Sequence, residues 1–148
     1  MGRVASTDLH AAIEQRLRAV DQRYTSGRRR LVEALTRAGR PMTLPDLLRL
    51  DHELAQSSAY RNLAVLEEVG VVARIVTSGD HASFELAEDL TEHHHHIVCS
   101  SCGEVSDFAL SPSLEAELEK VLETAARKAK YAVEQHRLDL IGRCSACR

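Results

Sequence analysis

The chain has 148 residues, of which 44% are hydrophobic and 3% aromatic, enough for one or two small domains with an aliphatic core. It has no apolar run near twenty residues, which excludes a transmembrane helix, and residues 1–8 lack the apolar stretch of a signal peptide. We therefore expect a reduced, cytoplasmic protein with no membrane partner.

The net charge of −3 is unevenly divided between the two halves. Residues 1–74 carry 12 Arg, no Lys and 9 acidic residues, whereas residues 75–148 carry 7 Lys and Arg, 13 acidic residues and six of the eight His. A cationic half suits a polyanion, and an anionic half rich in imidazoles suits metal ions.

Apolar residues at helical spacing predict four helices in the first half. The third is followed by a short linker and then by a helix that we expect Ser57 or Ser58 to cap and Gly70 to end. The first helix is expected over residues 6–20, the second begins at Arg28, the third follows Thr43, and the fourth follows Ser57 or Ser58.

The last two of these helices are typical of a helix-turn-helix. The fourth has an apolar stripe through Ala59 and Leu63, with Tyr60 and Arg61 off the stripe in its first turn. In this motif the N-terminal residues of the second helix meet base edges, Arg reads guanine, and Ser and Tyr contact phosphate. A basic run from Arg28 to Arg30 fits either an anion or a solvated turn. Our candidates for DNA contact are Arg28, Ser57, Ser58, Tyr60, Arg61 and Asn62.

Two strands over residues 71–76 and 82–86, joined by a turn at residues 78–80, predict the wing of a winged helix. The first domain is therefore expected to cover residues 1–87, and the acidic residues 88–92 to form a hinge. Residues 93–148 follow as a small domain with strands at 95–99, 104–108 and 131–141 and a helix from Ser111-Pro112. We expect zinc and self-association to complete the core of such a small domain.

The cysteines form two Cys-x-x-Cys pairs, and together they are all the cysteines in the chain: Cys99, Cys102, Cys144 and Cys147. Two such knuckles supply the four thiolates of a structural zinc site. A redox role would need one pair in a thioredoxin-like pattern, and disulfides would imply export. The sequence supports neither alternative.

Four histidines at residues 93–96 run directly into the first knuckle. Clustered imidazoles favour a metal site, although a solvated loop would also tolerate them. An expression tag is disfavoured, because the run is internal and leads into strand residues.

The chain resembles the ferric uptake regulator family of bacterial metal-responsive repressors, whose members sense zinc, iron, nickel, manganese or peroxide. The resemblance covers nearly the whole chain and rests on Ser58-Ala59-Tyr60-Arg61-Asn62-Leu63, Phe84-Glu85, His94-His95-His96-Ile97-Val98-Cys99-x-x-Cys102-Gly103 and His136-x-Leu138-x-Leu140-x-Gly142-x-Cys144-x-x-Cys147. It implies an α+β fold with an N-terminal winged helix-turn-helix and a small C-terminal α/β dimerisation domain. It also implies a homodimer that binds a double-stranded DNA operator.

The resemblance further implies three metal sites. The four cysteines fall on the structural zinc site. His94, His96 and Glu85 match the sensing site between the domains, and an additional site comprises His93, His95, Glu115 and His136. In a strand, alternate residues face opposite sides, which agrees with this division of the histidines.

Some positions depart from the family pattern. Pro41 stands where iron and peroxide sensors carry a histidine, and Ala73 and Ala87 stand where zinc sensors carry ligands. The fourth sensing ligand is thus unassigned, with His81 as our first candidate and His52 as a lesser one. Peroxide sensors usually have Asp at the position of Glu85, although Asp107 matches one of their ligands.

The resulting interpretation is a metal-dependent repressor closed by metal onto a palindromic operator. The favoured cofactors are structural zinc and regulatory zinc, as in a zinc uptake regulator; regulatory ferrous iron or a peroxide-sensing role is the alternative. Rivals from other classes are a zinc hydrolase and a metal-storage protein, neither of which explains the winged helix.

Overall fold

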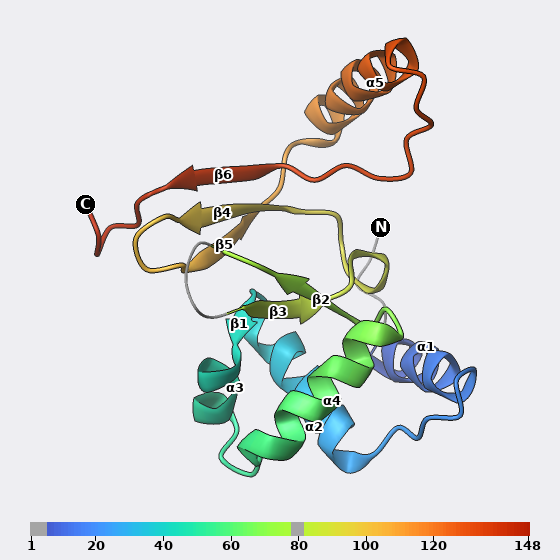
Figure 1. Ribbon diagram of the computed structural model, residues 1–148, viewed down its shortest axis with the longest axis vertical. Coiled ribbons are helices and arrows are strands. Elements are labelled where there is room, and N and C mark those ends of the chain that lie inside the picture. Colours follow the sequence, from blue (N-terminus) through green and yellow to red (C-terminus); the bar gives the residue numbers. More distant parts are fainter. Residues whose placement is uncertain (1–5, 78–81) are drawn as a thin grey trace.

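The computed structural model describes residues 6–77 and 82–148 (Figure 1). The N-terminal domain contains α1 (Ser6–Arg18), α2 (Ser26–Ala38), β1 (Met42–Thr43), α3 (Leu44–Leu50), α4 (Gln56–Glu68), β2 (Val72–Ile75) and β3 (Ser83–Leu86). A short 3-10 helix, η1 (Glu88–Leu90), leads to the C-terminal domain, which contains β4 (His95–Cys99), β5 (Val105–Phe108), α5 (Pro112–Lys128) and β6 (Asp139–Gly142). The expected α+β class and the winged helix are confirmed.

The N-terminal core is aliphatic, as the composition requires. It joins α1, α2, α3 and α4 to a three-stranded antiparallel sheet of order β1-β3-β2. On α4 the predicted stripe is buried, with Ala59, Leu63 and Leu66 at most 1% exposed. Tyr60 lies on the outer side of α4 and is 57% exposed. Packing of this apolar stripe therefore fixes which face of α4 is left for a partner.

Local sequence explains most of the helix boundaries, but not the start of α4. Thr43 and Asp46 form the capping box of α3, and Gly70 takes the left-handed conformation (φ 72°) just beyond α4. The expectation that Ser57 or Ser58 caps α4 is wrong. The helix starts at Gln56, after Ala55, and the Ser58 hydroxyl donates to the Ala55 carbonyl from inside the first turn.

The C-terminal sheet has β4 at its centre, in the order β5-β4-β6. β5 pairs with β4 antiparallel and β6 pairs with it parallel. The prediction of a strand from residue 131 is wrong for its first part, because β6 begins only at Asp139. β4 is only five residues long. The amide of His96, near its start, already donates to the carbonyl of Leu138, which directly precedes β6. Residues 131–137 therefore have no neighbouring strand to pair with.

The two domains meet through a small apolar contact and through η1. Ile75 of β2 packs against Val98 of β4 and Val105 of β5 in a cluster separate from the main core. η1 belongs to the N-terminal side in its packing, since Leu90 is buried in the N-terminal core. The predicted hinge at residues 88–92 is thus partly helical, and the exact domain boundaries stay a prediction.

Beyond its first turn, α5 lies apart from the rest of the chain (Figure 1). None of its side chains is buried in the described chain, and Leu114 and Val121 are 53% and 66% exposed. Among the residues that the structure describes, no helix combines the length and apolar character that crossing a membrane requires.

Candidate metal centres

Three groups of side chains that can bind metal meet around β4. In each group the ligand atoms lie within 4.8 Å of one another. We name them the thiolate cluster (Cys99, Cys102, Cys144 and Cys147), the wing cluster (Glu85, His94, His96 and Asp107) and the helix cluster (His93, His95, Glu115 and His136).

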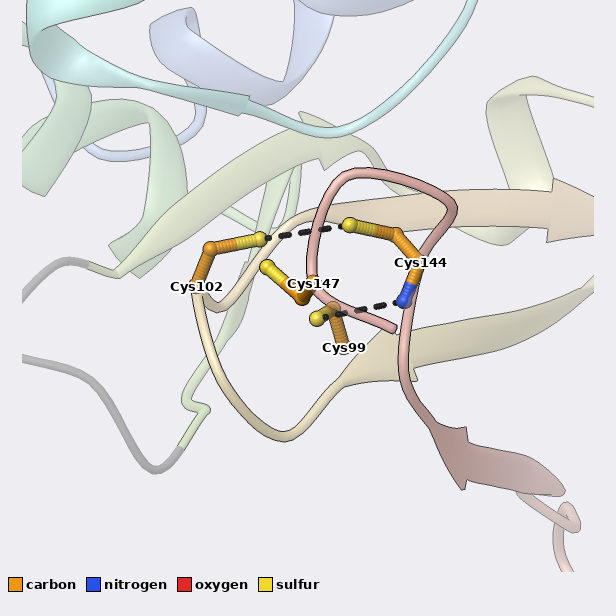
Figure 2. A group of neighbouring side chains, drawn as sticks. All are labelled: Cys99, Cys102, Cys144 and Cys147. Carbon is orange, nitrogen blue, oxygen red and sulfur yellow. Dashed lines mark hydrogen bonds between the residues drawn. The ribbon is translucent and has the colours of Figure 1, made fainter.

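The thiolate cluster forms because β4 and β6 run parallel and end together. Cys99 pairs in register with Gly142, and the turn after each strand then carries the remaining sulfurs (Figure 2). Cys102 Sγ lies 3.8 Å from Cys144 Sγ, too far for a disulfide. Four sulfurs at about 2.3 Å from one ion in a tetrahedron would be separated by about 3.8 Å, so the cluster fits zinc.

Backbone geometry also prepares this cluster for a cation. Gly103 has a φ of 77°, and its amide donates to the Cys99 carbonyl 2.9 Å away, which closes the first knuckle. Hydrogen bonds from backbone amides, the amide of Cys102 foremost, lower the pKa of the Cys99 thiol to about 6. The hydrogen bond with Cys147 raises the pKa of the Cys144 thiol. Packed sulfurs cannot all ionise without a cation to balance their charge.

The wing cluster joins the two domains. Glu85 lies on β3, and its two carboxylate oxygens are 3.0 Å from His94 Nε2 and 2.9 Å from His96 Nε2. Asp107 on β5 pairs in register with His96, and its oxygens lie 4.0 and 3.9 Å from the same two nitrogens. Two imidazoles and two carboxylates therefore surround one point, a donor set that suits zinc or ferrous iron.

The wing cluster holds its charges tightly. Burial raises the pKa of Glu85, but hydrogen bonds from His94 and His96 outweigh burial and bring it to about 2. The hydrogen bond to Glu85 raises the pKa of His94 to about 9 and also raises that of His96. Burial raises the pKa of Asp107. Without a cation, protons therefore bind the imidazoles of His94 and His96. A proton and a metal cation compete for the same ring nitrogens.

The helix cluster lies on the opposite face of β4. Glu115, in the first turn of α5, places its oxygens 2.9 Å from the Nε2 atoms of His93, His95 and His136. His95 is 2% exposed and packs against the ring of Phe108. The hydrogen bond from His95 lowers the pKa of Glu115.

One atom of the helix cluster has no hydrogen-bond partner among the described residues. His136 Nε2 is buried and lies 2.9 Å from Glu115 Oε1, but outside hydrogen-bonding geometry. An orphaned imidazole nitrogen that points at the same place as two other imidazoles and a carboxylate fits a cation bound between them.

The structure therefore groups the histidines as the family resemblance implies, while metal occupancy stays a prediction. Asp107 occupies the fourth position of the wing cluster, for which the sequence had favoured His81. His81 lies outside the described residues. His52 lines a different hollow, beside His10 and Arg30. From the sequence, Asp107 was expected only as a match to a ligand of peroxide sensors. The β4–β5 register places it in the wing cluster, because it pairs residue 107 with residue 96.

The candidate DNA-contacting residues gather at the start of α4. Ser57, Tyr60 and Arg61 are exposed there. Arg28 is engaged within the protein instead: its Nε donates to Asn62 Oδ1 at 3.2 Å and its Nη1 to the Arg23 carbonyl at 2.6 Å. Arg28, on α2, therefore orients the side chain of Asn62.

Comparison with known proteins agrees with this architecture. A family model described as the ferric uptake regulator family matches residues 19–141. The chain belongs to this family. Its members are metal-responsive, DNA-binding transcriptional regulators, and the family expected from the sequence is confirmed. The zinc-sensing subtype is not distinguished by these matches.

Three curated relatives and one solved structure illustrate the similarity. The ferric uptake regulation protein of Legionella pneumophila is 32% identical over 101 residues, covering 68% of this chain and 69% of the relative. The corresponding protein of Cupriavidus metallidurans is matched over 64% of its length. The peroxide operon regulator of Bacillus subtilis is 30% identical over 149 residues, covering 97% and 96%. The Helicobacter pylori ferric uptake regulator has the same fold, with a TM-score of 0.74 at 24% identity, covering 99% of this chain and 97% of that one.

The thiolate cluster yields a first prediction. Cys99→Ser should release zinc and unfold or monomerise the C-terminal domain, because metal-binding energy is part of the folding energy of so small a domain. Zinc content by elemental analysis, thermal unfolding and analytical ultracentrifugation measure the three effects. Ser101→Ala, in the same turn, is the control. A Cys99→Ser dimer with unchanged zinc and melting temperature would show that the four-cysteine assignment is wrong.

Proposed function

We propose that the protein is a cytoplasmic, homodimeric, metal-dependent repressor that binds a palindromic operator, and that the wing cluster is its sensing site. The observation that carries this proposal is that the ligand atoms of the wing cluster come from both domains. Glu85 comes from the wing of the N-terminal domain, whereas His94, His96 and Asp107 come from the C-terminal sheet and its leading residue. A bound divalent cation supplies a positive charge that donors of both domains share.

The small apolar contact between the domains supports this role. Ile75, Val98 and Val105 form the buried apolar cluster at the junction, so apolar burial contributes little to holding the domains together. Glu85 can join the histidines only when the wing lies against β4. Cation binding therefore favours the closed arrangement, and this differential affinity shifts the population towards it.

Exposed apolar side chains support a homodimer. Ile97, Leu140 and Ile141 on the C-terminal sheet are 41%, 48% and 76% exposed, and the apolar residues of α5 are also uncovered. Surfaces of this kind mark association sites, and a two-fold dimer would cover the same patch on both copies. It would also present two α4 helices to the two half-sites of a palindrome.

The regulatory cation is zinc in our first assignment and ferrous iron in the alternative. Imidazole and carboxylate donors suit both ions, and the Irving–Williams order favours zinc at equal availability. The alternative is supported by the relatives, which are iron and peroxide regulators. Operator binding measured separately with each metal distinguishes the two assignments. DNA binding without any hydrolytic turnover would exclude the zinc hydrolase.

The α4 surface yields a second prediction. Arg61→Ala should weaken operator binding by about 1–3 kcal/mol if Arg61 reads a base, or reduce the salt slope by about one unit if it contacts phosphate. Fluorescence anisotropy at two salt concentrations measures both quantities. Arg18→Ala, which removes an exposed arginine from α1, should bind like the wild type. Equal affinities for the wild type and Arg61→Ala at both salt concentrations would remove Arg61 from the interface.

The two histidine clusters yield a third prediction. His96→Ala should abolish metal-activated operator binding but leave the fold and the thiolate-bound zinc intact, because it removes a donor that joins the domains. His136→Ala, in the helix cluster, should weaken the response or the dimer without abolishing sensing. Titration of operator binding with metal measures both effects. If His136→Ala abolishes metal-activated operator binding and His96→Ala only weakens it, the helix cluster and not the wing cluster is the sensor.

The fourth ligand of the wing cluster yields a further prediction. Asp107→Ala should weaken the metal affinity of this cluster in the same direction as His96→Ala, since the site keeps only three of its four donors. His81→Ala should bind metal like the wild type. Competition with a chelator of known affinity measures the change. If His81→Ala is the damaging variant and Asp107→Ala is harmless, His81 is the ligand and our placement of Asp107 is wrong.

A further inference from the structure

Glu88 contacts the helix cluster although it is not one of its four members. Its Oε1 accepts a hydrogen bond from His93 Nδ1, and His93 Nε2 lies on the other side of the ring, 2.9 Å from Glu115 Oε1. The two nitrogens of one imidazole thus face two different carboxylates. Only the Nε2 side faces the point shared by the cluster.

The other histidines of the cluster indicate which ring nitrogen would bind a metal ion. His95 and His136 also direct Nε2 at Glu115, each at 2.9 Å. Nδ1 of His93 is therefore free to carry the ring hydrogen and to donate a hydrogen bond to Glu88. A carboxylate on the far nitrogen of a ligand histidine fixes its tautomer and ring orientation and makes the ligand nitrogen more basic.

Charge gives an independent reason for a second carboxylate at this cluster. The wing cluster has two, Glu85 and Asp107, which together balance a divalent cation. The helix cluster has only Glu115 among its members, so a bound divalent cation would leave one positive charge unbalanced. Glu88 supplies that missing negative charge at the solvent side, where the His93 side chain is 35% exposed.

Glu88 is also held by the N-terminal domain. It lies on η1, whose Leu90 is buried in the N-terminal core, and the amide of the preceding Ala87 donates to the Val71 carbonyl at 2.9 Å. The next residue, Asp89, is paired with Arg16, whose Nη1 donates to the Gly70 carbonyl at the end of α4. The carboxylate of Glu88 therefore reaches the C-terminal domain from the side that carries the DNA-reading helix.

We propose that Glu88 is a positioning residue for metal binding at the helix cluster, and that through the Glu88–His93 contact this cluster, like the wing cluster, joins the two domains. The proposal rests on the proposed function, because it requires that the helix cluster binds metal. It differs from an ordinary surface ion pair in its consequence. A surface pair would change the stability of the metal-free protein and leave metal affinity unaltered.

The test uses the full-length protein with zinc in the thiolate cluster and His96→Ala to disable the wing cluster. Co²⁺ is the probe, and its affinity is measured by competition with a chelator. Adding Glu88→Gln, which keeps the size of the side chain, should weaken Co²⁺ binding about 10–100-fold. Glu119→Gln is the matched control: it removes the same charge from an exposed position one turn beyond Glu115 on α5. It should not change the affinity.

Domain closure is the second readout. Saturating Co²⁺ should reduce the radius of gyration of His96→Ala in small-angle X-ray scattering by less than that of the wild type, because only the Glu88–His93 contact then joins the domains. Glu88→Gln should remove this partial reduction. If Glu88→Gln and Glu119→Gln bind Co²⁺ equally, or if Glu88→Gln changes only the melting temperature of the Co²⁺-free protein, the role of Glu88 is refuted while the helix cluster stands. If His96→Ala binds no Co²⁺ at all outside the thiolates, the metal-binding role of the helix cluster fails, and the proposal fails with it.

Discussion

The pleat of β4 is the constraint on which all three candidate metal centres depend. Successive side chains of an extended chain point to opposite faces, so the four histidines, two on β4 and two directly before it, divide into two pairs. One pair faces Glu85 on the wing, and the other faces Glu115 on α5. The same strand ends at Cys99, which places the thiolate cluster at its tip. A one-residue shift in the register of β4 would exchange the two histidine faces and disconnect both clusters.

Features that depend on local pattern could be predicted from the sequence, whereas features that depend on register could not. Periodicity located α4 and its buried stripe, and the Cys-x-x-Cys spacing located the knuckles. The family resemblance matched Asp107 to a ligand of peroxide sensors, but its position beside His96 follows from which residues pair across the β4–β5 hairpin, not from its neighbours in sequence. β6 is shorter than its alternating pattern because the length of a strand is set by the neighbour it pairs with. The start of α4 was also misjudged: the helix begins at Gln56, after Ala55, and the Ser58 hydroxyl donates to the Ala55 carbonyl from inside the first turn.

The weakness of the domain junction is what makes the proposed metal switch possible. A large apolar interface would hold the domains closed with or without a cation, and no ligand could then shift the equilibrium measurably. With Ile75, Val98 and Val105 alone buried in its apolar cluster, the junction leaves room for Glu85 and the histidines to decide the arrangement. Without a cation, protonated His94 and His96 can pair with Glu85 and hold the same closed arrangement. The proposed switch therefore depends on how much more strongly a divalent cation than these protons interacts with Glu85 and Asp107 together.

The two histidine clusters are physically linked because they occupy opposite faces of one strand. His95 and His96 are neighbours on β4 and face opposite sides of it, so the strand fixes one imidazole of each cluster relative to the other. The carboxylates that complete the two clusters come from different elements, Glu85 from β3 and Glu115 from α5. Any change that displaces β4 therefore alters both clusters at once.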